Sequence, residues 1–147
     1  MKKFELTAES KIFAGKKLFR IKALISFGNV REGELGGYVE KEENLSNDGD
    51  AWVSGNARVY GDAEVFGDAR VYGDADYATV HGFGSEYRTT TFFRTKAGDI
   101  GVRCGCFYGT LEEFRAKVKE THGETKTAKE YLMVADLMEF RFSKEEA

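Results

Sequence analysis

Two histidines and two cysteines are the residues of this chain whose types most readily support catalysis or metal binding. His81 precedes Gly82 at the end of a repetitive stretch, where an imidazole facing a cleft can act as a general base. His122 lies in the segment Lys-Glu-Thr-His-Gly, which reads as the end of a helix, and an imidazole there interacts favourably with the helix dipole. His81 is therefore the stronger candidate for a catalytic base.

Cys104 and Cys106 place two thiols on the same side of a predicted strand, because side chains alternate along an extended chain. A closed zinc site needs four ligands, and His122 adds only one to these two. We therefore expect buried structural thiols, with no metal site and no cofactor. The sequence contains no recognisable phosphate-binding loop, nucleophile elbow or pair of catalytic carboxylates.

The element that precedes these side chains in the chain is a six-residue repeat between Asp50 and Tyr77. Small residues recur at fixed places in four successive units, namely Ala51, Ala57, Ala63 and Ala69, then Val53, Val59, Val65 and Val71, then Gly55, Gly61, Gly67 and Gly73. No helix has a period of six, and this alternation followed by a Gly-Asp or Gly-Asn turn is typical of a β-solenoid. We expect the alanines and valines to fill a narrow dry interior. Residues 18 positions apart should then stack, with Trp52 over Arg70 and Arg58 over Asp76.

The side chains that the repeat turns outward form the predicted partner-binding surface. It consists of acidic and aromatic residues: Asp62, Glu64, Asp68, Asp74, Asp76, Tyr60, Phe66 and Tyr72. Residues 40–86 carry three basic against eleven acidic side chains, a net charge of −8. Turn chemistry alone favours Asp and Asn, and a docking surface for a basic protein is the alternative. Three alternatives exist for what covers the aromatic rings: flanking elements of the chain, another subunit or a foreign partner.

The chain divides into three predicted parts: an N-terminal β cap (1–38), the repeat (39–86), and a C-terminal β-hairpin with two helices (87–147). The hairpin is predicted to pair Thr89–Thr95 with Ile100–Tyr108. Capping boxes at Thr110 and Thr127 are predicted to begin the two helices. Tyr131, Leu132, Ala135 and Met138 are assigned to the inner face of the second helix.

Units of the form Ala-Arg-Val-Tyr-Gly-Asp resemble those of the hexapeptide-repeat, left-handed β-helix superfamily. The segments Leu35–Ser46 and Phe92–Phe114 resemble a group of small prophage-type proteins. The fold class expected is therefore mainly β, a short left-handed β-helix with an N-terminal β cap and a small C-terminal α+β element. The superfamily includes acyltransferases, which use an imidazole base, and carbonic anhydrases, whose three metal-binding histidines this chain cannot supply.

These observations predict a non-enzymatic binding protein. The prophage-type resemblance suggests a host-interaction or anti-defence factor, such as an anti-CRISPR-like inhibitor that docks on a bacterial protein, for example a nucleic-acid-binding immune effector. The alternatives are an acyltransferase using His81, a structural or assembly module, and a nucleotide-binding sponge. A homo-oligomer is left open.

Charge and cysteine content indicate the setting of the protein. The chain has 22 basic and 25 acidic side chains, a balance that argues against direct nucleic-acid binding and membrane association. No apolar run approaches the ~20 residues that span a bilayer. Two neighbouring cysteines and an N-terminus without a signal-like pattern indicate the cytoplasm, here that of a bacterial host cell.

Overall fold

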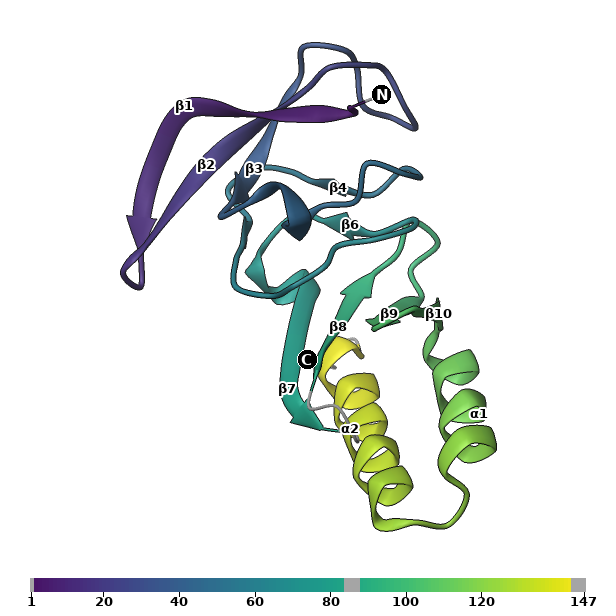
Figure 1. Cartoon of the computed structure of the whole chain (residues 1–147). Helices are drawn as coiled ribbons and strands as arrows, with labels where there is room; N and C mark the ends of the chain where they lie inside the picture. Colours follow the sequence, from purple (N-terminus) through teal and green to yellow (C-terminus); the bar gives the residue numbers. More distant parts are fainter. Residues whose placement is uncertain (1, 84–87, 144–147) are drawn as a thin grey trace.

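Strand β8 (Arg88–Arg94) joins the two halves of the molecule, which we describe from a computed structural model covering residues 2–83 and 88–143. Neighbouring side chains of a strand point to opposite faces. Phe93 accordingly packs into a core built from the N-terminal half, whereas Phe92 packs into a second core shared with the C-terminal helices. Figure 1 shows this strand between the N-terminal strands and the two helices.

The N-terminal half is organised by a long hairpin, β1 (Phe4–Phe13) and β2 (Lys16–Ala23). Strand β3 (Leu35–Val39) pairs antiparallel with β2, and β5 (Arg58–Val59) pairs parallel with β3. The result is a mixed four-stranded sheet in the order β1-β2-β3-β5. The buried residues of β2 are Leu18, Ile21 and Ala23.

The repeat contributes a second, two-stranded parallel pair, β4 (Trp52–Val53) and β6 (Arg70–Val71), and two short 3-10 helices, η1 (Glu42–Asn44) and η2 (Asp74–Asp76). The predicted stacking of Trp52 over Arg70 is confirmed, because these residues are partners in the β4–β6 ladder. The predicted dry interior is also confirmed for the repeated small residues. Those buried are Ala51, Val53, Ala57, Val59, Ala63, Val65, Ala69 and Val71.

The predicted left-handed β-helix is nevertheless wrong. The residues that the structure describes form a mixed sheet, an antiparallel sheet and a parallel pair, together with two helices. The strands β4, β5 and β6 are each two residues long, and β3 pairs antiparallel with β2 on the edge where a further parallel coil was predicted. The repeat ends at Gly73. The backbone of Gly73 is extended, whereas Gly55 at the equivalent position of an earlier unit has a φ of 61°.

The C-terminal half is an antiparallel meander covered by two helices. Its strands β7 (Tyr77–Phe83), β8, β9 (Ile100–Cys104) and β10 (Phe107–Thr110) lie in the order β10-β9-β8-β7. The predicted hairpin is confirmed as the β8–β9 pair, but its second strand, predicted to reach Tyr108, ends at Cys104. Strand β7 falls within the predicted repeat but pairs with β8, and the predicted boundary at residues 86 and 87 lies outside the described residues.

Helices α1 (Leu111–His122) and α2 (Lys126–Phe142) lie side by side at the end of the molecule (Figure 1). The predicted capping box of α1 is confirmed, since the Thr110 hydroxyl accepts from the Glu113 amide at 3.1 Å. The predicted cap of the second helix is wrong. Thr125, not Thr127, accepts from the Ala128 amide, at 3.2 Å.

Within the described residues, neither helix combines the length and apolar character needed to cross a bilayer.

Candidate functional site

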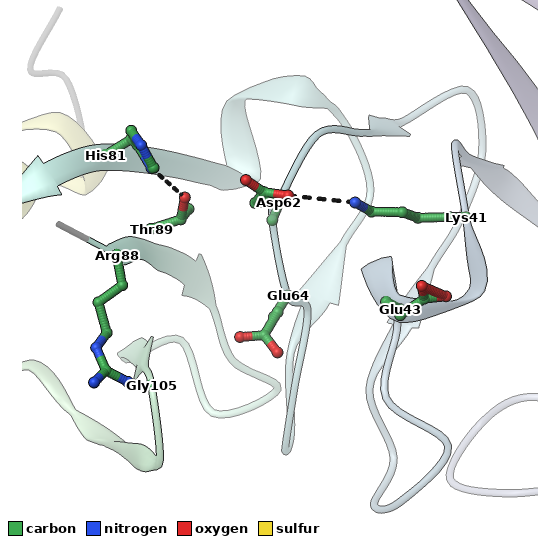
Figure 2. Close-up of a pocket in the computed structure, with 9 residues that line it drawn as sticks. Lys41, Glu43, Asp62, Glu64, His81, Arg88, Thr89 and Gly105 are labelled. Atoms are coloured by element: carbon green, nitrogen blue, oxygen red, sulfur yellow. Dashed lines mark hydrogen bonds and ion pairs between the residues drawn. The ribbon is translucent and has the colours of Figure 1, made fainter. Parts of the chain in front are cut away.

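An open cavity of about 380 Å³ lies where the repeat meets the C-terminal meander (Figure 2). Its charged lining side chains come from four segments: Lys41 and Glu43 at η1, Asp62 and Glu64 from the connection between β5 and β6, His81 from β7, and Arg88 from β8. The amide of Glu64 donates to the Thr91 hydroxyl at 2.9 Å, which fixes this connection against β8. The cavity brings together two predicted partner-binding acids and the predicted candidate base.

The carboxylates of the cavity are only loosely paired. Lys41 Nζ lies 3.3 Å from an Asp62 oxygen, and the Asp62 side chain is 69% exposed. Arg103 Nε lies 3.8 Å from a Glu64 oxygen and finds no hydrogen-bond partner among the described residues. The exposed Lys41–Asp62 pair contributes about 0–1 kcal/mol. Because an ionised carboxylate can accept about four hydrogen bonds, Asp62 and Glu64 retain capacity for an incoming donor.

His81 is exposed at the edge of the cavity, and its Nδ1 lies 2.8 Å from the Thr89 hydroxyl (Figure 2). This contact orients the ring. His122, in the last turn of α1, has its ring centroid 6.0 Å from that of Tyr131. The two histidines therefore lie in different parts of the C-terminal half, and only His81 lines the cavity.

Two other acids of the predicted surface are held by arginines. Asp74 accepts hydrogen bonds from the Arg58 guanidinium, with Nε at 2.9 Å, and from the Arg58 amide. Asp76 accepts from Arg94 Nε at 3.0 Å and from the amide of Tyr72 at 2.9 Å. Arg58 therefore pairs with Asp74, and the predicted contact between Arg58 and Asp76 is wrong. These two carboxylates stabilise a turn of the chain.

Asp68 differs from these acids. Its side chain is exposed, and its hydrogen bonds are formed by its backbone amide and carbonyl. Its amide donates to the Tyr108 hydroxyl at 3.3 Å, and its carbonyl accepts from the Lys96 amide at 2.8 Å. The structure does not place Asp68 in the lining of the cavity.

The aromatic residues of the predicted surface are covered in two cases out of three. Tyr60 packs against Phe13 of the N-terminal hairpin, with ring centroids 5.6 Å apart. Phe66 packs against Tyr108 at 5.1 Å, and the Arg103 guanidinium lies over its ring. Tyr72 is 66% exposed. The flanking elements that the sequence predicted as one possible cover therefore account for Tyr60 and Phe66.

The two cysteines are free thiols in different surroundings. Cys104 is half-buried and accepts a hydrogen bond from the Thr90 hydroxyl at 3.2 Å. Cys106 is exposed, so its predicted burial is wrong, because Gly105 turns the chain between β9 and β10 with a φ of 59°. In the part of the chain that the structure describes, no group of three histidine, cysteine or acidic side chains could hold a metal ion.

One surface was missed by the sequence reasoning. Met133, Leu137 and Phe140 are 71%, 57% and 79% exposed on the side of α2 away from its core-facing residues. We call these three side chains the outer stripe. Their spacing of four and three residues was a sufficient signal, since residues so spaced share one face of a helix.

Comparison with protein-family models gives no match for this chain, and no curated protein matches it.

Proposed function

We propose that this chain is a non-enzymatic binding protein that docks on a basic surface of a bacterial host protein through the cavity lined by Glu43, Asp62 and Glu64. The observation that carries the proposal is that three carboxylates line one open cavity beside two cations, Lys41 and Arg88, while the ion pairs of Asp62 and Glu64 are 3.3 and 3.8 Å long. A lysine or arginine side chain of the partner can enter such a site and form charge-assisted hydrogen bonds with carboxylate oxygens.

The class of partner follows from chemistry together with the prophage-type resemblance. A protein that acts on nucleic acid carries a basic surface, and a host immune effector of that kind would present arginines and lysines to the cavity. The proposal therefore retains an anti-defence role within a bacterial cell. The proposed docking site is smaller than the predicted acidic surface. It leaves out Asp74 and Asp76, because these carboxylates already accept hydrogen bonds from Arg58 and Arg94.

The experiment is a binding measurement on a partner captured from bacterial lysate and then purified. The double variant Asp62→Asn, Glu64→Gln preserves side-chain shape and removes two charges. A hydrogen bond to a charged group contributes about 1.5–3 kcal/mol, so we expect the dissociation constant to rise at least tenfold. Affinity should also fall steeply between low and physiological salt.

The matched control is Glu120→Gln, which removes an exposed charge on α1 that pairs weakly with Lys117 at 3.9 Å. Its affinity should equal that of the wild type. Equal affinity of the double variant, or a complex insensitive to salt, would contradict docking at the cavity.

A second candidate function is acyl transfer, favoured by the position of His81 in the same cavity. It predicts turnover of acyl-CoA that His81→Ala abolishes and His122→Ala leaves unchanged. Identical background rates in all three proteins would remove it.

A further inference from the structure

The outer stripe lies opposite the face of α2 that packs into the C-terminal core. Tyr131, Ala135 and Met138 are buried on the inner face, and each residue of a helix is rotated by about 100° from the one before. Met133, Leu137 and Phe140 consequently point away from the protein. Exposed apolar groups gathered on one face, unlike single ones, are typical of an interaction site.

We propose that the outer stripe is where two copies of this chain associate, with α2 of one copy packed antiparallel against α2 of the other about a two-fold axis. In a two-fold interface the same surface must be complementary to itself. An axis passing near residue 135 places Met133 of one copy opposite Leu137 of the second. This surface is separate from the cavity of the proposed function, and the two proposals can fail independently.

The charges beside the stripe support the antiparallel arrangement. The helix rotation places Lys129 and Asp136 on one side of the stripe, and Glu130 and Arg141 on the other. Antiparallel pairing about this axis turns Glu130 toward Arg141 of the second copy. Within the described chain neither Glu130 nor Arg141 forms an ion pair, whereas Asp136 is already paired with Arg115 at 2.9 Å.

A hollow beside α2 offers room for the largest side chain of the stripe. Its volume is about 640 Å³, and Ala128, Lys129 and Leu132 line it together with Lys119 and Gly123 at the end of α1. Phe140 lies some 11 residues further along α2 than Lys129, which is about 17 Å at ~1.5 Å per residue. The axis near residue 135 places Phe140 of one copy opposite position 130 of the other copy, which is next to Lys129 in the lining of the hollow.

The expected contact is modest in size. A stable interface buries about 800 Å² on each partner, and three side chains supply only part of that area. We therefore expect self-association that depends on protein concentration.

Analytical ultracentrifugation of the full chain tests the proposal. The wild type should show a reversible monomer–dimer equilibrium, and Leu137→Asp should weaken it at least tenfold. The matched control is Ile12→Asp, which places the same charge at a residue of the N-terminal hairpin that is 71% exposed; association should be unchanged. A monomer at every concentration, or equal weakening by the control, would overturn the proposal and leave a different partner to cover the stripe.

A charge exchange tests the antiparallel geometry. Glu130→Arg and Arg141→Glu should each weaken association, because each places like charges opposite one another. The double variant should restore the wild-type equilibrium, since it exchanges the two partners across the interface. If the single variants weaken association and the double variant does not recover it, the antiparallel pairing is wrong. Circular dichroism confirms that each variant is folded.

Discussion

Lys3 is a lysine inside the N-terminal core, 1% exposed, whose ammonium donates to the Ala51 carbonyl at 2.6 Å. The pKa of Lys3 is lowered from 10.5 to about 8, chiefly because burial disfavours the charged ammonium and also because of the nearby charge of Arg70. Asp50 acts in the opposite direction and raises the pKa. A buried amine with this pKa is costly to keep charged at neutral pH.

This pKa predicts how stability depends on pH. Between pH 8 and 10.5 the unfolded chain holds the Lys3 proton and the folded chain releases it, so the free energy of unfolding should rise with pH. The contribution is up to roughly 3 kcal/mol, because one pKa unit corresponds to about 1.4 kcal/mol. Urea unfolding at pH 7 and pH 10 checks it. Lys3→Met should lack this rise, and an equal rise in both proteins would assign it to other groups.

At the scale of elements, the contact between β9 and β8 holds the two cores together. A Cβ atom added at Gly101 would come within 2.4 Å of the Phe93 ring, and Phe93 is fully buried in the N-terminal core. Because Gly101 has no side chain, the Phe93 ring can pack directly against the backbone of β9. The ring has no free space into which it could retreat without disturbing close packing.

Gly101→Ala should accordingly lower the free energy of unfolding by about 1–3 kcal/mol, the usual cost of overpacking a core. Gly73→Ala is the matched comparison, because Gly73 has extended backbone and nothing within 4 Å of an added Cβ. Its effect should be neutral or stabilising by up to about 1 kcal/mol. Chemical denaturation of both variants decides this, and equal losses would show that Phe93 is not the obstacle.

The elements show what sequence patterns can establish. The β8–β9 hairpin, the Thr110 cap and the buried alanines and valines follow from local periodicity and capping chemistry, and each is confirmed. The β-helix failed because strand pairing is a long-range choice. A six-residue period fixes which side chains face inward but not whether β3 pairs with a further coil or with β2. Thr125 and Thr127 offer the same capping group, and only the end of α1 at Gly123 favours Thr125.

The candidate site was predictable only in part, for the same reason. Asp62 and Glu64 were singled out as acids of the repeat, yet nothing local shows that they meet His81 and Glu43 in one cavity. Arg94 lies 18 residues from its partner Asp76 in the chain. Neutralisation of the predicted acidic surface by such arginines therefore emerges only from tertiary structure.

At the scale of the whole molecule, the cavity and the outer stripe are separate surfaces with different physical character. The cavity is lined by charged side chains and its Lys41–Asp62 pair is exposed, so salt should govern what binds there. The stripe is apolar, so its association should depend on protein concentration and respond weakly to salt. A molecule built this way can pair through α2 while each copy presents its own cavity to a basic partner.

The most direct test of the central claim is a nuclear magnetic resonance titration of the full chain with a short arginine-rich peptide. Docking at the cavity predicts that the largest saturable shifts of backbone amides fall at Glu43, Asp62, Glu64 and His81, and that Asp62→Asn with Glu64→Gln abolishes them. Shifts centred instead on Asp74 and Asp76, or spread evenly over the acidic residues, would contradict it.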